Sequence, residues 1–90
     1  MNNQRLPKLI SKIGELQKEL IESNKKESAS YFDELRKKIE TSKLDFLKRR
    51  YIKRILKLGK LPDAVGFNRR QEDLFDEIFD IATDILNKKA

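Results

Sequence analysis

The sequence predicts an all-α protein, a small antiparallel three-helix bundle with a long central helix. Apolar residues recur at steps of three and four, and no stretch alternates between apolar and polar residues. Polar or glycine-containing segments divide this pattern into three parts. Since 90 residues are enough for one domain, we expect a single helical domain over 1–90, with helices at about 6–26, 30–58 and 68–88.

The first predicted helix runs from Leu6 to Lys26. Its apolar residues fall on one face of a helix, and they are Leu6, Leu9, Ile13, Leu16 and Leu20. The polar stretch 22–28 ends this stripe and predicts the turn to the next helix.

The second predicted helix begins near Ser30, an N-cap with Asp33 three residues on. It continues without Gly or Pro to Gly59, which we expect to end it in the left-handed conformation. Its apolar face changes side along the way. One face carries Phe32, Leu35, Ile39 and Phe46, and the other carries Leu44, Leu47, Tyr51, Ile55 and Leu58. We therefore expect the first half to pack on the first helix and the second half on a later element.

A loop over 60–67, containing Pro62 and Gly66, leads to the third predicted helix. Asn68 is its expected N-cap, and Gln71 would complete a capping box. Lys88 and Lys89 are expected in its last turn, where cations suit the helix dipole. Its apolar side carries Leu74, Phe75, Ile78, Phe79, Ile81, Ala82, Ile85 and Leu86.

The residue types exclude several classes of chemistry. The chain has no cysteine and no histidine, so thiolate and imidazole ligands are absent, as is the usual general base. Asp73, Asp76, Asp80 and Asp84 lie on one helix face, which offers a metal ion oxygens from one side only. We expect no catalytic site, metal or cofactor. No apolar run is long enough to span a membrane, and no secretory signal follows Met1, so we expect a cytoplasmic location.

The positive charge is concentrated in one segment of the chain. The formal net charge is +6, and residues 43–60 hold eight Lys or Arg against Asp45 alone, whereas residues 68–90 hold six acidic and four basic residues. A basic ridge on the far end of the second helix would contact nucleic-acid phosphates. The predicted contact residues are Lys48, Arg49, Arg50, Lys53, Arg54, Lys57 and Lys60. This hypothesis assumes an unbroken helix over 30–58, and the alternative is a solvated face balanced by the acidic third helix.

The apolar arc of the third helix is wider than one neighbouring helix usually covers. Phe75, Phe79 and Leu86 form its outer edge. They predict either packing against both other helices or a docking edge for a protein partner or a second copy of the chain.

The layout of the chain resembles a known family. A helix opening with Leu6-Pro7 precedes a long helix that carries the run Phe46–Lys53, and an acidic-aromatic helix with the run Glu72–Phe79 follows a Pro-containing loop. This arrangement is similar to the helical domain of GINS subunits, the four-part assembly that supports the replicative helicase. Residues Phe46, Leu47, Arg50 and Lys53 match the family's pattern aromatic-Leu-x-x-Arg-x-x-Lys-Ile, and Arg54 stands in place of the final Ile. GINS subunits usually also carry a small β-rich domain, for which the sequence shows no segment.

The resemblance implies a non-enzymatic accessory subunit of a DNA replication assembly. It would dock through helix faces onto replication proteins such as sister subunits, a helicase or a polymerase, with the basic ridge towards DNA. Two alternatives remain: a stand-alone basic nucleic-acid-binding protein, and a helical bundle of the bacteriocin-immunity or antitoxin kind.

Overall fold

The computed structural model describes residues 5–87, and this part of the chain holds five helices and no strand. The helices are α1 (Arg5–Glu22), α2 (Lys26–Thr41), α3 (Asp45–Leu56), α4 (Leu61–Val65) and α5 (Arg69–Asn87). The predicted all-α class is confirmed. The expectation of one long central helix is wrong, because α2 and α3 replace it and the short α4 lies in the predicted loop.

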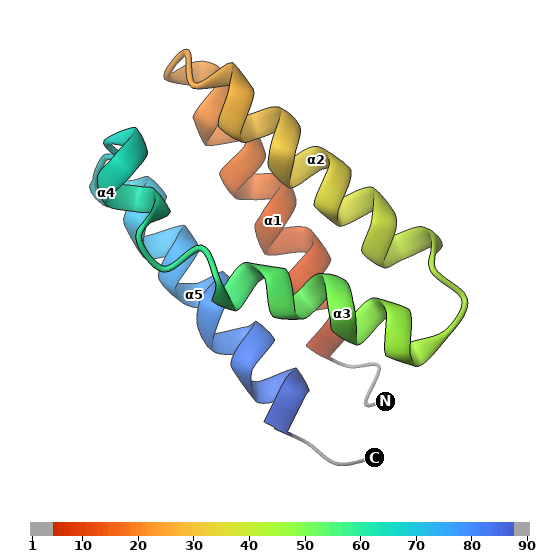
Figure 1. Ribbon diagram of the computed structural model, residues 1–90. Coiled ribbons are helices and arrows are strands. Elements are labelled where there is room, and N and C mark those ends of the chain that lie inside the picture. Colours follow the sequence, from red (N-terminus) through yellow and green to blue (C-terminus); the bar gives the residue numbers. More distant parts are fainter. Residues whose placement is uncertain (1–4, 88–90) are drawn as a thin grey trace.

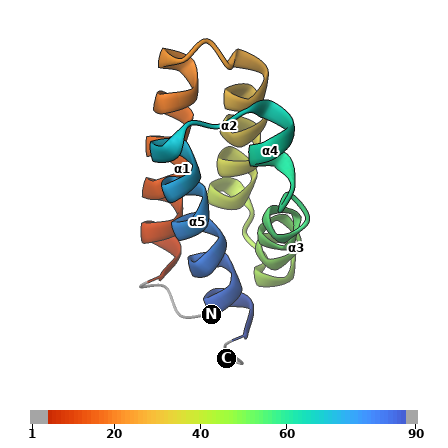
Figure 2. The same cartoon turned by 90° about the vertical axis from the view of Figure 1, so that its left-hand side faces the viewer.

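Helix α1 lies between α2 and α5, and both run antiparallel to it (Figure 1). Helix α3 lies across the bundle and packs on α2 and α5. Figure 2 shows α3 nearly end-on beside the three long helices. Helix α4 packs on α5. The first helix, and not the second, is therefore the central one.

The core forms where the apolar stripes of these helices meet. The predicted stripe of α1 is confirmed, since Leu9, Ile13, Leu16 and Leu20 have no exposed surface. Helix α2 adds Ala29, Phe32, Leu35 and Ile39, and helix α5 adds Leu74, Phe75, Ile78, Ile81, Ala82 and Ile85. Burial of such side chains stabilises a fold by roughly 1.5–3 kcal/mol each, so these stripes account for most of the drive towards this arrangement.

The turn between α1 and α2 is shorter than predicted. Asn24 adopts a left-handed conformation with a φ of 65°. The N–H of Lys25 donates to the carbonyl of Leu20 at 2.8 Å, and the N–H of Asn24 donates to that of Ile21 at 3.1 Å. This pair of bonds is a Schellman motif, which ends α1 at Glu22. Ser30, the expected N-cap, instead lies inside α2, which already begins at Lys26.

The predicted long helix is interrupted at residues 42–44. The hydroxyls of Thr41 and Ser42 donate back to the carbonyls of Lys37 and Lys38, at 2.8 and 2.6 Å. Ser42 and Leu44 adopt extended conformations, with ψ angles of 128° and 132°. Hydroxyl side chains that bond to the preceding turn compete with the helical ladder. The change of side in the apolar pattern coincides with this break, where the chain redirects α3 across the bundle.

The break changes which residues of this segment are buried. Phe46 was expected on the face shared with Phe32, but 60% of its surface is exposed. Leu44, expected on the other face, is 53% exposed. Ile52 belongs to neither predicted face and is fully buried, together with Ile55.

The segment between α3 and α5 contains a glycine in the left-handed conformation, but it is not the glycine that the sequence predicted. Gly59 does not have a positive φ, so the expectation of a left-handed cap there is wrong. Gly66 does, with a φ of 78°, and it ends α4. The N–H groups of Gly66 and Phe67 both donate to the carbonyl of Pro62 at 2.9 Å.

The predicted capping box at the start of α5 is confirmed. The N–H of Gln71 donates to Oδ1 of Asn68 at 2.9 Å, and the N–H of Asn68 donates to Oε1 of Gln71 at 3.0 Å. The capping box is satisfied in both directions, so the first turn of α5 is well defined. Lys88 and Lys89, expected in the last turn of this helix, lie outside the described residues.

Candidate nucleic-acid interface

The outward side of α3 and the turn after it carry five exposed cations. They are Arg50, Lys53, Arg54, Lys57 and Lys60, which we call the α3 basic face. Residues 46, 50, 53 and 57 follow one another at steps of four, three and four, so they form one row along the helix. The opposite side of α3 buries Ile52 and Ile55. The helix is therefore held by its apolar side and presents its cations outward.

Carboxylates of the described chain do not neutralise this face. Two acidic residues of α5 pair with α1 instead: Glu77 with Lys12 at 3.1 Å and Asp84 with Arg5 at 3.0 Å. A further bridge between these helices joins Glu19 to Arg70 at 3.1 Å. Within residues 5–87, no ion pair involves any of the five cations of the α3 basic face. The unbroken helix over 30–58 on which the sequence hypothesis rested is absent. The case for this face rests instead on its exposure and on the lack of ion pairs within residues 5–87.

Two predicted contact residues have a different position. Lys48 and Arg49 are half-buried at the start of α3. Nζ of Lys48 donates to the carbonyl of Ile39 at 3.2 Å, and Arg49 donates to that of Leu86 at 2.8 Å. These are carbonyls of the last turns of α2 and α5, which lack intrahelical partners and carry the negative end of the helix dipole. Both cations hold α3 against its neighbours.

Tyr51 joins the basic face to the core. Its side chain is half-buried against the core, as its place in the apolar pattern predicted. The guanidinium carbon of Arg54 lies 5.3 Å from the ring centroid, and Nζ of Lys38 lies 5.8 Å from it. Such cation–π contacts fix the direction of a long side chain. Arg54 therefore has an intramolecular contact that Arg50, Lys53 and Lys57 lack.

Phe46 lies in the same row as these cations, and sequence reasoning missed it. It was assigned to a buried face on the assumption of a continuous helix. The available signal was its spacing, since Phe46 precedes Arg50 by four positions and Lys53 by seven. The outward row of α3 thus combines an exposed ring with cationic side chains.

The predicted docking edge of the last helix lies largely inside the bundle. Phe75 is 3% exposed, and its ring meets those of Phe32 and Phe67 edge-on, at centroid distances of 6.4 and 6.2 Å. Phe79 and Leu86 are half-buried and pack against the same core. Phe75 therefore packs against the other helices, which was one of the two outcomes that the sequence allowed, and does not form a docking edge.

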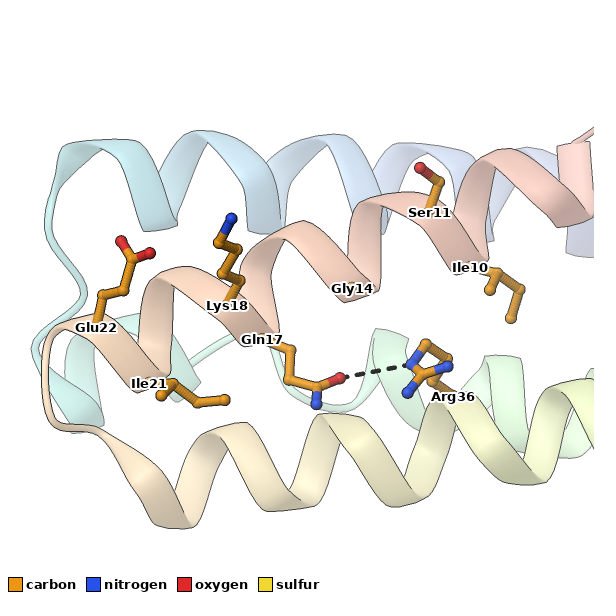
Figure 3. Close-up of a pocket in the computed structure, with 8 residues that line it drawn as sticks. All are labelled: Ile10, Ser11, Gly14, Gln17, Lys18, Ile21, Glu22 and Arg36. Atoms are coloured by element: carbon orange, nitrogen blue, oxygen red, sulfur yellow. Dashed lines mark hydrogen bonds between the residues drawn. The ribbon is translucent and has the colours of Figure 1, made fainter.

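A shallow groove runs along the outer side of α1 and α2 (Figure 3). It is lined by Ile10, Ser11, Gly14, Gln17, Lys18, Ile21, Glu22 and Arg36. Its central polar groups bond to one another: Nε of Arg36 donates to Gln17 at 3.5 Å, and the same guanidinium pairs with Asp33 and Glu40 at 2.8 and 2.7 Å. Gln17 and Arg36, the polar side chains that meet across the groove, are therefore bonded to each other.

Two titratable groups are held in their charged forms by contacts between or beside the helices. The hydrogen bond from Lys37 holds the pKa of Asp33 below its usual value, and bonds from Arg36 and Gln17 act in the same direction. The hydrogen bond to Glu77 raises the pKa of Lys12, and the charge of Glu15 adds to this. Lys12 therefore links α1 to α5 through Glu77, whereas the cations beside Asp33 belong to its own helix α2. Neither pKa is shifted towards neutral pH, as that of a general acid or base would be.

Two other kinds of site are absent from residues 5–87. This part of the chain contains no group of three or more acidic side chains that could hold a metal ion. Nor does it contain a helix long and apolar enough to cross a membrane. No protein-family model, curated protein or solved structure matches the chain.

Proposed function

We propose that this protein is a non-enzymatic nucleic-acid-binding module that holds phosphate groups on its α3 basic face. One observation carries the proposal. Five exposed cations gather on one side of a helix, and no carboxylate of residues 5–87 pairs with them. Unpaired cations in a row suit a polyanion with regularly spaced charges, because each phosphate contact releases condensed counterions.

The contacts divide the predicted residues by role. Arg50, Lys53 and Lys57 are free of intramolecular partners in the described chain and would bind phosphate directly. Lys48 and Arg49 would support the face by fixing α3, since their charges are already directed at helix carbonyls. Binding of this kind positions a nucleic acid without reading its sequence.

A charge-reversal experiment tests the proposal. The variant Arg50→Glu/Lys53→Glu/Lys57→Glu removes three cations from the face and leaves Arg54 on Tyr51. Its matched control, Lys8→Glu/Lys18→Glu/Lys26→Glu, changes the net charge equally at exposed positions of α1 and α2. Fluorescence anisotropy with a labelled oligonucleotide should show at least a tenfold loss of affinity for the first variant and a much smaller one for the control.

Salt dependence provides a second measurement in the same experiment. The slope of log K against log salt should become shallower by about 2–3 for the α3 variant, because about 0.7–0.9 counterions are released per phosphate contact. Equal losses in both triple variants would contradict the proposal, since they would reflect net charge alone. So would a wild-type protein that fails to bind at about 50 mM salt. Circular dichroism melting confirms that each variant is folded.

A second proposal is that the protein acts as an accessory subunit of a DNA replication assembly. Its support is the resemblance to GINS subunits, together with the position of the matching residues. Phe46, Arg50 and Lys53 belong to that pattern and are all exposed in one row of α3. Affinity purification from the cells that naturally produce the protein should then recover replication proteins, and a purification that recovers none would contradict it.

A further inference from the structure

We infer that the ligand of the α3 basic face is a single-stranded nucleic acid, one base of which stacks on the ring of Phe46. This inference rests on the proposed function and adds the class of nucleic acid. It comes from the one phenylalanine of the described chain that lies outside the aromatic cluster of the core.

The ring of Phe46 is open to solvent. It is the most exposed large hydrophobic side chain of residues 5–87, at 60%. The other four phenylalanines contact one another's rings or that of Tyr31, at centroid distances between 5.9 and 6.4 Å. Phe46 has no ring–ring or cation–ring contact with a described residue. Both faces of this ring are therefore uncovered by aromatic or cationic groups of that part of the chain.

Its neighbours along the helix are cations. Arg50 follows Phe46 by four positions and Lys53 by seven, and both are exposed. Lys43, also exposed, lies in the linker before α3. From Phe46 to Lys57 the row extends for about 16 Å. A strand laid along it would meet the ring at one end and phosphate-binding side chains over the rest. Aromatic rings interspersed with cations are the arrangement by which proteins hold single strands without sequence preference.

Duplex DNA and a lipid bilayer fit these contacts less well. In a duplex the π-faces of the bases are stacked on one another, so the ring of Phe46 would reach none without unstacking them. A helix lying in a bilayer surface needs an apolar side to insert, and that side of α3 is buried through Ile52 and Ile55. Only Leu44 and Phe46 would be left to enter lipid.

Binding measurements on Phe46 variants test the inference. Anisotropy is measured with a labelled single strand of about 12 nucleotides, once as DNA and once as RNA, and with the duplex of the same sequence. Binding to vesicles that contain anionic lipid is measured alongside. Phe46→Ala and Phe46→Leu should each weaken single-strand binding by about tenfold and duplex binding by less than twofold. Phe46→Trp should retain or strengthen single-strand binding. Leu keeps an apolar side chain but has no π-face, so a loss of affinity in Phe46→Leu would show that stacking, and not hydrophobic contact, is required.

A fluorescence experiment observes the stack directly. The chain has no tryptophan, so Phe46→Trp introduces a single indole. Its emission should be quenched when the single strand is added and much less when the duplex is added. Tyr31→Trp is the matched control, because Tyr31 is the other well-exposed aromatic residue and lies on α2, away from the basic face. Its emission should not change.

The outcomes separate this inference from the proposed function. If Phe46→Ala binds single strands as tightly as the wild type does, while the Arg50/Lys53/Lys57 variant no longer binds them, the stacking inference is overturned and the nucleic-acid function stands. If neither single strands nor duplex bind the wild type at about 50 mM salt, both fail, whether or not the vesicles bind. Stronger binding to either single-stranded DNA or RNA supports the inference and indicates which of them is the natural ligand.

Discussion

Gln71 is the one polar residue buried in the described core. Its side-chain amide has four hydrogen-bond partners. Oε1 accepts from the N–H of Asn68 at 3.0 Å and from Lys25 at 3.1 Å, and Nε2 donates to Ser23 at 2.6 Å and to the carbonyl of Glu19 at 3.2 Å. A single side chain thus joins the start of α5 to the end of α1 and the turn after it. Buried amides are tolerated when satisfied in this way.

We expect Gln71→Leu to lower the free energy of unfolding by about 2–4 kcal/mol, because the four hydrogen bonds of a buried amide are lost and the N–H of Asn68 loses its capping-box partner. Leucine fills a similar volume, so the loss would not come from a cavity. The neighbouring exposed residue provides the control, since Glu72→Ala should change stability by no more than about 0.5 kcal/mol. Urea unfolding followed by circular dichroism measures both. Equal stabilities of Gln71→Leu and wild type would show that the amide network contributes nothing.

At the scale of the element, α3 is held by its apolar side and by its first turn. Lys48 and Arg49 meet the carbonyl ends of α2 and α5. Cations at these ends oppose the negative pole of each helix. The first turn of α3 therefore fixes the helix, and its later turns present the exposed cations.

This division predicts opposite effects for two cations of the same helix. Arg49→Met should lower the free energy of unfolding by about 1–2 kcal/mol, because the carbonyl of Leu86 loses a charge-assisted bond. It should leave nucleic-acid affinity nearly unchanged well below the melting temperature. Lys53→Met should leave stability within about 0.5 kcal/mol and weaken binding. Thermal melting and anisotropy on the same two preparations decide between these patterns, and a binding defect in Arg49→Met alone would reverse the assigned roles.

The elements that could be predicted are those whose signals are local. The stripes of α1 and α5 and the capping box of Asn68 and Gln71 depend on residues within a few positions of each other. The break at 42–44 contains neither Gly nor Pro, and its signal was the pair of hydroxyls of Thr41 and Ser42 where the apolar face changes side. Assuming a continuous helix hid the exposure of Phe46.

The roles of Lys48 and Arg49 could not be predicted from local signals. The bond from Arg49 to Leu86 joins residues 37 positions apart. Arg49 and Arg50 are adjacent members of one basic run and point about 100° apart around the helix, but only the packing of α3 on α5 shows that Arg49 is the one with an intramolecular partner. The cationic segment could therefore be predicted as a whole, whereas the division between supporting and exposed cations required the structure.

At the scale of the whole molecule, α1 is the element to which α2 and α5 are tied. Charged contacts at both of its sides accompany the apolar core. Nζ of Lys12 pairs with Glu77 of α5 at 3.1 Å, and Nε2 of Gln17 donates to Asp33 of α2 at 3.2 Å. Ion pairs and hydrogen bonds of charged groups thus join α1 to α2 and α5, whereas no ion pair within residues 5–87 involves the α3 basic face.

Lys12 and Asp33 predict how stability depends on pH, because the bond to Glu77 raises the pKa of Lys12 and the bond from Lys37 lowers that of Asp33. The pKa of Asp33 is lowered on folding, so its contribution is fully present above its unfolded value near 3.8 and is lost as the pH falls through the folded pKa. The pKa of Lys12 is raised, so its contribution is present below its unfolded value near 10.5 and is lost as the pH rises through the folded pKa.

The melting temperature of Asp33→Asn should therefore lie below that of the wild type at neutral pH, and the difference between the two should narrow only below about pH 4. The difference in melting temperature between Lys12→Met and the wild type should narrow only above about pH 10. Each variant serves as the control for the other, because other titrating groups affect both alike. A difference for Asp33→Asn that stays constant down to about pH 2 would mean that its carboxylate is not held by Lys37 and Arg36.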